Sequence, residues 1–273
     1  MTRPFPSLWP AAVRIAVVLV MCVPAARVPA AEAVGANRPN FLVLVADDMN
    51  FDSPGFAGGV APDVTPNLDR LARESMLFTK AHVAVSVCQP SRQSMLSGKY
   101  PHRYGGVGFF PMAKNTPTVS ARLAQAGYLT AGLNKLWHTL PRNAFAWDLD
   151  GDGMDLGIAG HGMGRVPEAL GLGVTRAIRA AEEQGKSFFI MVNSDDPHRP
   201  FHGSPGEKGT FQEKLQLLPA PSRVYGPDEV TLPRSVPDLP GIREDLARYA
   251  SSVRRLDDTV GACLEALRDA GHE

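Results

Sequence analysis

The chain has 273 residues, and 28 Lys and Arg side chains balance 28 Asp and Glu side chains. This near-neutral balance gives no reason to expect nucleic acid or a membrane surface as a partner. With only three cysteines the chain is not a disulfide scaffold, and its length suffices for one large α/β domain with a substantial core.

The amino terminus is typical of a secretory signal peptide. Arg3 and Arg14 flank its start, residues 15–23 are apolar, and small residues within 28–33 offer a cleavage site. The apolar run is too short to span a bilayer. We therefore expect residues 1–33 to be a signal peptide, residues 34–273 to form one domain, and the protein to be exported, periplasmic or secreted, without stable membrane association.

Continuous apolar runs that alternate with helical patterns predict an α/β fold. Strands buried on both faces of a parallel sheet are expected at residues 40–46, 128–133 and 187–193. Helices are expected at 65–75, 119–126, 169–183 and 241–270. The alternation predicts a three-layer αβα sandwich with a mainly parallel buried sheet.

Three finer expectations follow from the same patterns. In the first helix Leu68, Leu71 and Ala72 should face inward. Cys263 lies on the apolar stripe of the last helix, which predicts a buried free thiol. Residues 197–240 are rich in Pro and Gly and should form an ordered surface excursion, not a second domain.

Asp47 and Asp48 follow the first predicted strand directly. The carboxyl ends of strands in open α/β sheets are where ligands bind. Two adjacent carboxylates suit a hard divalent cation, which prefers oxygen ligands. The alternative is a strand-end carboxylate that caps the next turn.

The segment Cys88-Gln-Pro-Ser-Arg92 is followed at once by the run from Met95 to Arg103. Pro90 suits the first turn of a helix, so residue 88 should lie at a helix N-terminus, where backbone N–H groups favour negative charge. Arg92, one turn on, would reach back toward an oxyanion at position 88. The alternatives are a buried structural cysteine or a half-cystine paired with Cys263.

The two segments together resemble the signature of the formylglycine-dependent sulfatases, a family with an alkaline-phosphatase-like fold. The resemblance implies that a maturation enzyme oxidises Cys88 to formylglycine, whose hydrated aldehyde supplies a nucleophilic hydroxyl. Attack on sulfur would release the alcohol or amine, and the geminal hydroxyl would then eliminate sulfate. The resemblance also implies that Asp47, Asp48 and residue 88 bind Ca²⁺, with Arg92 as a further site residue.

Three more site residues are implied by the resemblance. Lys135 and His138 follow the second strand with two residues between them, a spacing similar to iduronate-type sulfatases. Lys135 would contact the sulfate, and His138 would take the proton when the covalent sulfate is expelled. His198, in a Pro-His-x-Pro segment, would contact the sulfate and the leaving group. The alternatives are a surface lysine, a Trp-packed histidine and a loop histidine.

Residues 188–201 and 243–257 resemble the heparan N-sulfatases, which implies a sulfated small molecule or sulfated glycan as substrate. Asp195, Asp196 and Arg199 are candidates for the substrate pocket. Residues 148–153 match half of an EF-hand loop, but Ala159 stands where a bidentate Glu is needed, which favours a surface turn.

Sulfatases continue after the long helix into another strand, an Asp-(His/Asn)-Gly segment with two more metal ligands, and a further lysine. This sequence ends at Glu273, so we expect the C-terminal part of the fold to be absent and a sheet edge to be unpaired. The alternatives to an active sulfatase are an inactive sulfatase-fold fragment and a phosphatase or phosphodiesterase of the same superfamily. The cysteine at position 88 disfavours a phosphatase or phosphodiesterase, because such enzymes use Ser or Thr as the nucleophile. A hydrolase that uses the Cys88 thiol is a further alternative.

Overall fold

The computed structural model describes residues 38–151, 163–211 and 217–273, which belong to one compact unit, Arg38–Glu273. The predicted signal peptide lies outside the described residues. Helices longer than a turn are α1 (Pro66–Glu74), α2 (Cys88–Ser97), α3 (Pro101–Tyr104), α4 (Val119–Gln125), α5 (Pro167–Glu183), α6 (Pro205–Thr210) and α7 (Pro240–Asp269). The strands are β1 (Phe41–Val45), β2 (Leu129–Leu133), β3 (Leu149–Asp150) and β4 (Phe188–Asn193).

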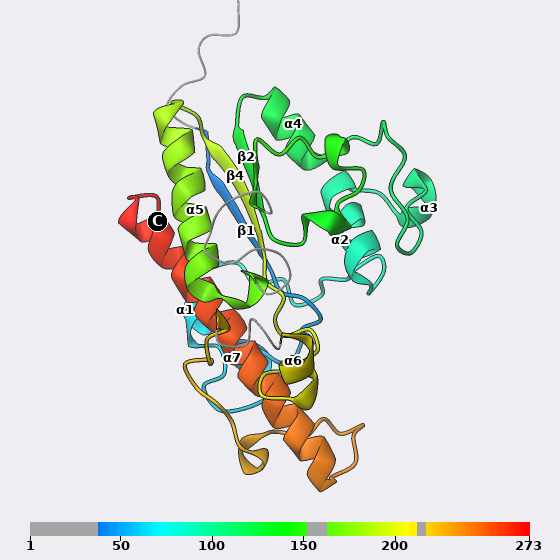
Figure 1. Cartoon of the computed structure of the whole chain (residues 1–273), viewed down its shortest axis with the longest axis vertical. Helices are drawn as coiled ribbons and strands as arrows, with labels where there is room; N and C mark the ends of the chain where they lie inside the picture. The colour runs from blue at the N-terminus through cyan, green and yellow to red at the C-terminus, as the bar shows by residue number, and fades with distance from the viewer. Residues whose placement is uncertain (1–37, 152–162, 212–216) are drawn as a thin grey trace, which may run out of the picture. The chain divides into compact units, whose positions relative to one another are not determined.

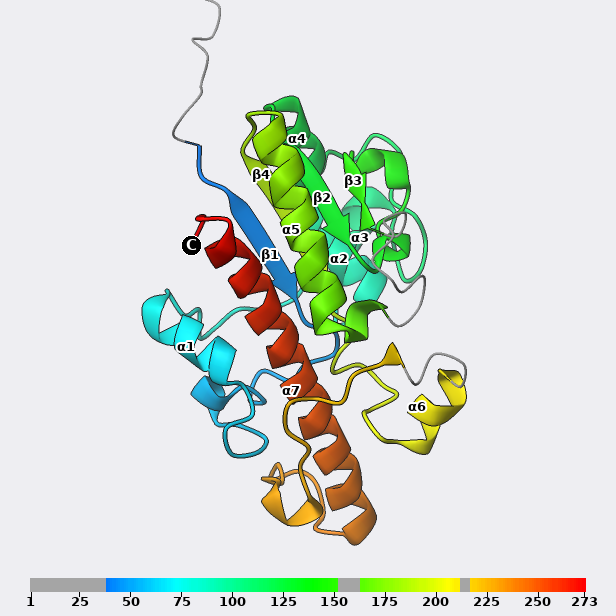
Figure 2. The same cartoon turned by 60° about the vertical axis from the view of Figure 1, so that its left-hand side comes forward.

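The four strands form one parallel sheet in the order β1-β4-β2-β3. Every residue of β2 and β4 is buried, as the apolar runs predict. The same prediction is wrong for β1, which is only half-buried and leaves Phe41 39% exposed. The reason is its place at the edge, where no described strand pairs with its outer side (Figure 2).

Helices cover both faces of the sheet, which confirms the three-layer prediction (Figure 1). On one face α5 packs against α7, and Ile178 and Cys263 join β2 and β4 in one apolar cluster. On the other face Leu96 of α2 and Phe145 pack against Phe189 and Met191 of β4. These two apolar clusters hold the sheet in place, and the loops leave from the ends of its strands.

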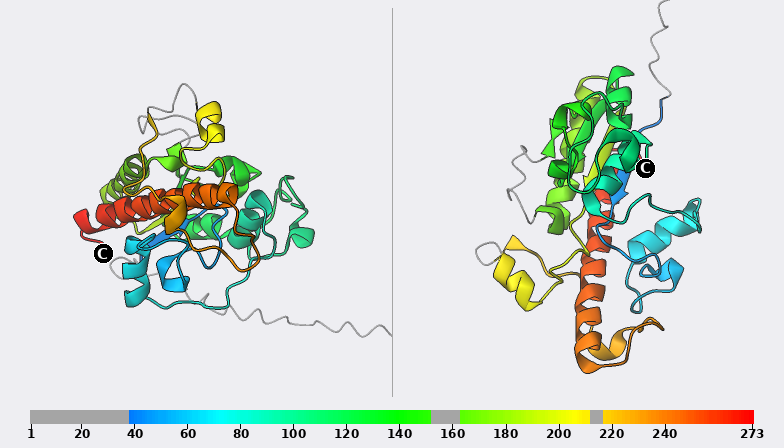
Figure 3. Two further views of the ribbon diagram at one scale, coloured as in Figure 1. Left: turned by 90° about the horizontal axis from the view of Figure 1, so that it is seen from below. Right: turned by 90° about the vertical axis from the view of Figure 1, so that its right-hand side faces the viewer.

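Helix α1 packs against α7 (Figure 3), and a side chain of α7 caps its first turn. The Asp257 carboxylate accepts hydrogen bonds from the backbone N–H groups of Asn67 and Leu68, at 2.9 and 2.8 Å. These are orphan donors of the first helical turn. The expectation that Leu71 faces inward is wrong, since its side chain is 36% exposed.

The structure also tests several smaller expectations from the sequence. Cys263 is a free and fully buried thiol, and burial raises its pKa to about 12. The predicted turn is wrong for Leu149 and Asp150, which form β3 beside β2. The end of the half EF-hand match, residues 152–153, and Ala159 lie outside the described residues. The described residues of the excursion include α6 and the 3₁₀ turn Pro227–Glu229, which packs on α7.

Among the described residues, no helix has both the length and the apolar character needed to cross a membrane.

Candidate active site

The carboxyl ends of three strands bring the candidate residues together. Val45 of β1 lies beside Asn193 of β4, and Leu133 of β2 lies beside Val192, so the loops that follow leave the sheet at one edge. Asp48, Asn134 and Lys135 all have positive φ angles, of 59°, 60° and 54°. Non-glycine residues adopt this left-handed conformation at a cost, and such residues gather at functional sites.

Asp47 is the centre of this edge. Its carboxylate accepts hydrogen bonds from the Arg92 guanidinium, with Nη2 3.3 Å from Oδ1, and from the Lys135 ammonium. Its backbone N–H donates to the carbonyl oxygen of Asp196 at 3.1 Å. Burial opposes ionisation of Asp47, but Lys135 and Arg92 outweigh it, so the pKa of this carboxyl is lowered. Asp47 is therefore a buried carboxylate that keeps its charge because two cations contact it.

Helix α2 presents its first turn to Asp47. Cys88 is the first residue of the helix, as predicted, and Arg92 lies one turn further on. Besides contacting Asp47, Arg92 donates to the side-chain oxygen of Asn193. Cys88 is half-buried and free, so it does not pair with Cys263. No N-cap side chain accepts a hydrogen bond from the first turn of the helix, whose leading N–H groups have no intrahelical acceptor.

Lys135 and His138 both lie at the same edge despite the two residues between them. Lys135 is only 7% exposed, which rules out the alternative of a surface lysine. His138 ends a 3₁₀ turn, Leu136–His138, that packs on α2. Burial, and then the positive charges of Lys135 and Arg92, lower its pKa to about 4. The imidazole is therefore neutral at physiological pH and able to accept a proton.

His138 also packs against aromatic rings, as the Trp-packed alternative requires. Its ring centroid lies 5.9 Å from that of Trp137 and 6.1 Å from that of Phe109, both edge-on. Its buried Nδ1 has no hydrogen-bond partner in the described part of the chain. An unpaired buried nitrogen beside two cations marks a place where a polar ligand group would be stabilised.

His198 approaches the site from the loop after β4. Its Nε2 lies 3.5 Å from Oδ2 of Asp48, and its Nδ1 contacts the carbonyl oxygen of Arg199. Both side chains of the His198–Asp48 pair are largely exposed, at 41% and 59%. The two face each other across the open side of the strand ends.

The structure corrects one of the three candidates for the substrate pocket. Asp196 is fully buried between Arg165 and Arg255, where no substrate reaches it. Asp195 belongs to the Asp47 cluster, since its Oδ1 lies 3.7 Å from Lys135 Nζ and accepts from Asn134 at 3.0 Å. Arg199 is exposed.

Sequence reasoning missed Asn193, which joins the parts of this cluster. Its side-chain oxygen accepts from Arg92, and its Nδ2 donates to the carbonyl oxygen of Asn134 at 2.8 Å. The available signal was a polar residue that ends an otherwise apolar strand.

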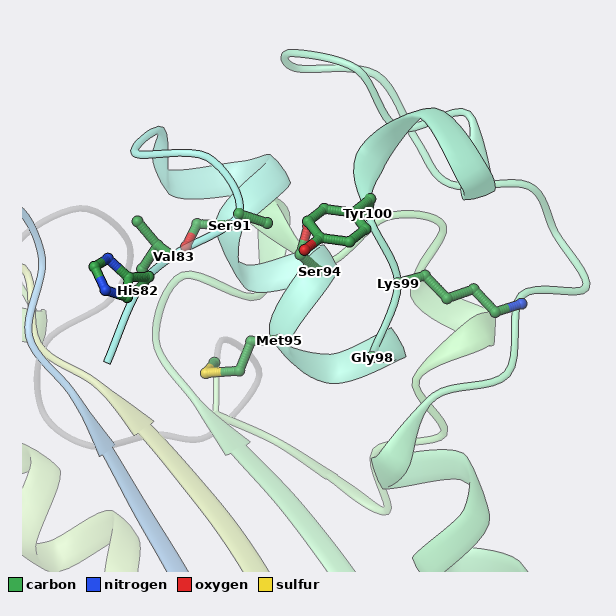
Figure 4. Close-up of a pocket in the computed structure, with 9 residues that line it drawn as sticks. His82, Val83, Ser91, Ser94, Met95, Gly98, Lys99 and Tyr100 are labelled. Atoms are coloured by element: carbon green, nitrogen blue, oxygen red, sulfur yellow. The ribbon is translucent and has the colours of Figure 1, made fainter. Parts of the chain in front are cut away.

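Two cavities lie near these elements. One of about 420 Å³ adjoins the site, and it is bordered by Asp48 and Arg199 on one side and by Tyr249 of α7 on another. Another of about 660 Å³ runs along α2 and is bordered by His82, Met95 and Tyr100 (Figure 4). None of the predicted site residues lines this second cavity.

The carboxylates at the site are ligands of the type that a hard cation prefers, but they are too few to complete its coordination. Asp47 and Asp48 supply the carboxylate oxygens that calcium prefers, whereas calcium takes about six to eight oxygen ligands. Within the described ranges, no three His, Cys, Asp or Glu side chains are grouped so that they could hold a metal ion. The remaining ligands would have to come from residue 88, from water or from groups other than these two carboxylates.

Comparison with known proteins identifies the family. The family model described as Sulfatase matches residues 39–273. The human N-sulphoglucosamine sulphohydrolase is 33% identical over 256 residues, which cover 86% of this chain and 48% of that protein. This chain belongs to the sulfatase family, whose members are sulfuric ester hydrolases, and it spans about half the length of the human relative.

Solved structures agree on the fold. A structure in complex with its substrate D-glucosamine-2-N,6-O-disulfate has a TM-score of 0.61 at 20% identity, covering 86% of this chain and 63% of that one. The phosphonate monoester hydrolase of Silicibacter pomeroyi has a TM-score of 0.56 at 18% identity, covering 86% and 60%. Because the same fold serves both, the fold alone does not choose between sulfate and phosphonate esters.

Proposed function

We propose that this chain carries the nucleophile-bearing part of a sulfatase active site that hydrolyses a sulfate ester or an N-sulfate. The observation that carries the proposal is the contact between Arg92 and Asp47. It brings the Cys88–Arg92 segment, which has the sulfatase signature, to the strand ends that hold the carboxylates and Lys135. The sequence motif and the charged cluster are therefore parts of one site.

The cysteine at position 88 is proposed to act as formylglycine, after oxidation by a sulfatase-maturing enzyme. Once converted, residue 88 supplies a geminal diol, of which one hydroxyl forms the bond to sulfur and the other allows release of the sulfate. The uncapped N–H groups of α2 and the Arg92 guanidinium stabilise negative charge at this position.

The other side chains act on the sulfate and on protons. Lys135 neutralises charge on the sulfate oxygens. His138 is proposed to take the proton when the covalent sulfate is expelled, and its pKa of about 4 keeps the imidazole in the neutral form that this role requires. His198 lies on the exposed side, opposite Asp48, and is suited to contact the leaving group.

A calcium ion is proposed to bind at Asp47 and Asp48, with residue 88 as a third ligand. When bound, it supplies positive charge to the sulfate and to the hydroxyl of residue 88.

The substrate is proposed to be a sulfated sugar. The 420 Å³ cavity beside Asp48 falls in the range of small-molecule sites. The Arg199 guanidinium and the Tyr249 ring on its border are groups that bind anionic substituents and sugar faces. Two relatives support this class, since one is named for N-sulphoglucosamine and another is solved with a sulfated glucosamine.

The test is hydrolysis of N-sulfoglucosamine and of a chromogenic aryl sulfate by protein made together with a sulfatase-maturing enzyme, in the presence of calcium. Sulfate release should be abolished in Cys88→Ala and retained in Cys263→Ala, which removes a thiol far from the site. Measurable sulfate release that is equal in Cys88→Ala and in the native chain would refute the proposal.

We also propose export to the periplasm or the exterior, on the strength of the residues that precede the catalytic region. Fractionation of cells that express the chain should place it outside the cytoplasm, with an amino terminus near residue 31 or 34. A cytoplasmic protein that begins at Met1 would contradict this.

A further inference from the structure

We propose that Arg255 and Arg165 are positioning residues, which act through Asp196 to hold Asp47 and His198 at the candidate site. The positioning role of Arg255, Arg165 and Asp196 is inferred from contacts within the chain. It depends on the proposed function only in taking Asp47 and His198 as site residues.

Asp196 is clamped by two guanidinium groups. Arg255 of α7 donates from Nε to Oδ2 at 2.7 Å and from Nη2 to Oδ1 at 3.1 Å. Arg165 donates from Nη1 to Oδ1 at 2.6 Å. Asp196 and Arg255 are fully buried and Arg165 is 2% exposed, so these hydrogen bonds are shielded from water.

The cluster balances its own charge. Arg255 also contacts Glu207 of α6, with Nη2 2.9 Å from Oε1, so two arginines face two carboxylates. Burial, and then the charge of Arg255, lower the pKa of the neighbouring His202, which favours its neutral form. Because the charges cancel internally, no ligand is needed to balance them, and the cluster is suited to hold backbone in place.

The backbone that it holds belongs to the site. The carbonyl oxygen of Asp196 accepts the hydrogen bond from the Asp47 N–H, at 3.1 Å. Arg165 donates a further bond, from Nη2 to the carbonyl oxygen of His198, at 2.8 Å. The clamp thus links Asp47, in the loop after β1, and the segment that carries His198 to Arg255 of α7.

A substitution that keeps the positive charge of an arginine but removes its paired hydrogen bonds separates a positioning role from a general loss of stability. Lysine retains the charge of arginine but cannot make the paired hydrogen bonds. The matched control is Glu207→Gln, which removes one arm of the same buried cluster but leaves the Asp196 clamp in place. Arg165→Lys is the second test variant, and it decides the matter if Arg255→Lys does not fold.

The whole chain would be labelled with ¹³C-histidine, and the His198 ring signal, assigned with His198→Gln, would be followed at one fixed alkaline pH. Inorganic sulfate would be titrated by calorimetry, and stability measured by urea unfolding. We expect Arg255→Lys and Arg165→Lys to shift the His198 signal and weaken sulfate binding about tenfold or more. Glu207→Gln should lose stability without either effect.

Two results would overturn the proposal. In one, both lysine variants fold and keep the native His198 signal and sulfate affinity. In the other, Glu207→Gln changes the signal and the affinity as much as the lysine variants do, which would indicate general loosening. If the native chain binds no sulfate, the proposed function fails, while the His198 signal still decides the positioning role.

Discussion

Lys135 and Arg92 place two positive charges on one buried carboxylate, that of Asp47. Taking charges out of water is costly unless they are paired, so such a cluster is stable only while its partners stay in contact. The three side chains come from the loop after β1, the loop after β2 and helix α2. Their meeting point is therefore sensitive to the packing of all three elements.

We predict that Lys135→Ala weakens the binding of inorganic sulfate by about tenfold to a hundredfold, the effect of losing one charge-assisted hydrogen bond. The control is Lys186→Ala, which removes a lysine at the opposite end of the sheet, before β4. Calorimetric titration of both variants measures the difference. Equal affinities in the two variants would remove Lys135 from the site.

His138 gives a prediction on pH. Its pKa of about 4 in the folded chain lies below the ordinary value of 6.5. As pH falls from the higher value to the lower, the unfolded chain takes up a proton that the folded chain does not, so folding loses stability over this window. Urea unfolding should show this loss in the native chain and less of it in His138→Gln. Parallel pH profiles would contradict the assigned environment.

At the scale of the elements, α7 connects the parts of the molecule. It packs on α5, caps α1 through Asp257 and clamps the site loop through Arg255. Because one helix makes all three contacts, a substitution that displaces α7 at one of them also disturbs the other two. Buried polar residues of α7 therefore contribute more contacts between elements than the apolar stripe of the helix alone indicates.

We predict that Asp257→Ala lowers the free energy of unfolding by about 1–3 kcal/mol, because it leaves the Asn67 and Leu68 N–H groups without a partner. The control is Asp269→Ala, an exposed carboxylate in the last turn of the same helix, for which we expect a change within about 0.5 kcal/mol. Urea denaturation measures both. An effect of Asp257→Ala as small as that of the control would contradict the capping role.

Local patterns sufficed to predict the long elements. Apolar runs located β2 and β4, and the three-to-four-residue period located α5 and α7, each within about two residues. They did not reveal that β1 is half-buried, because burial at a sheet edge depends on neighbours distant in sequence. The two-residue strand β3 is too short to have a period at all.

The candidate site could be predicted only where a motif names the residue. Asp47, Arg92 and Lys135 meet as the sulfatase resemblance implies. Asp196 is predicted to line the substrate pocket with Asp195 and Arg199, yet its side chain turns inward to Arg255. Pairing between buried charges on distant elements leaves no periodic signal, so no sequence pattern could have found it.

At the scale of the whole molecule, large apolar side chains remain on the surface. Phe51, Met76 and Phe78 are 89%, 80% and 74% exposed, and the chain spans 48% of the human relative. The two candidate metal carboxylates also fall short of the ligands that calcium takes.

We predict that these 273 residues alone hydrolyse an aryl sulfate at least about a hundredfold more slowly than a chain extended to the relatives' length. Each missing contact to calcium or sulfate costs transition-state stabilisation of a few kcal/mol, or orders of magnitude in rate. Both chains would be assayed over a calcium titration. Comparable turnover would show that Asp47 and Asp48 suffice and that the metal site is assigned wrongly.

The central claim, that residue 88 serves as a sulfatase nucleophile, is tested most directly by the mass of one peptide. Trypsin cleaves after Lys80 and Arg92 and releases Ala81 to Arg92 with position 88 inside it. In protein made with a sulfatase-maturing enzyme, this peptide should have lost one sulfur and two hydrogens and gained one oxygen. An intact, alkylatable thiol at position 88 in all of the protein would contradict the account.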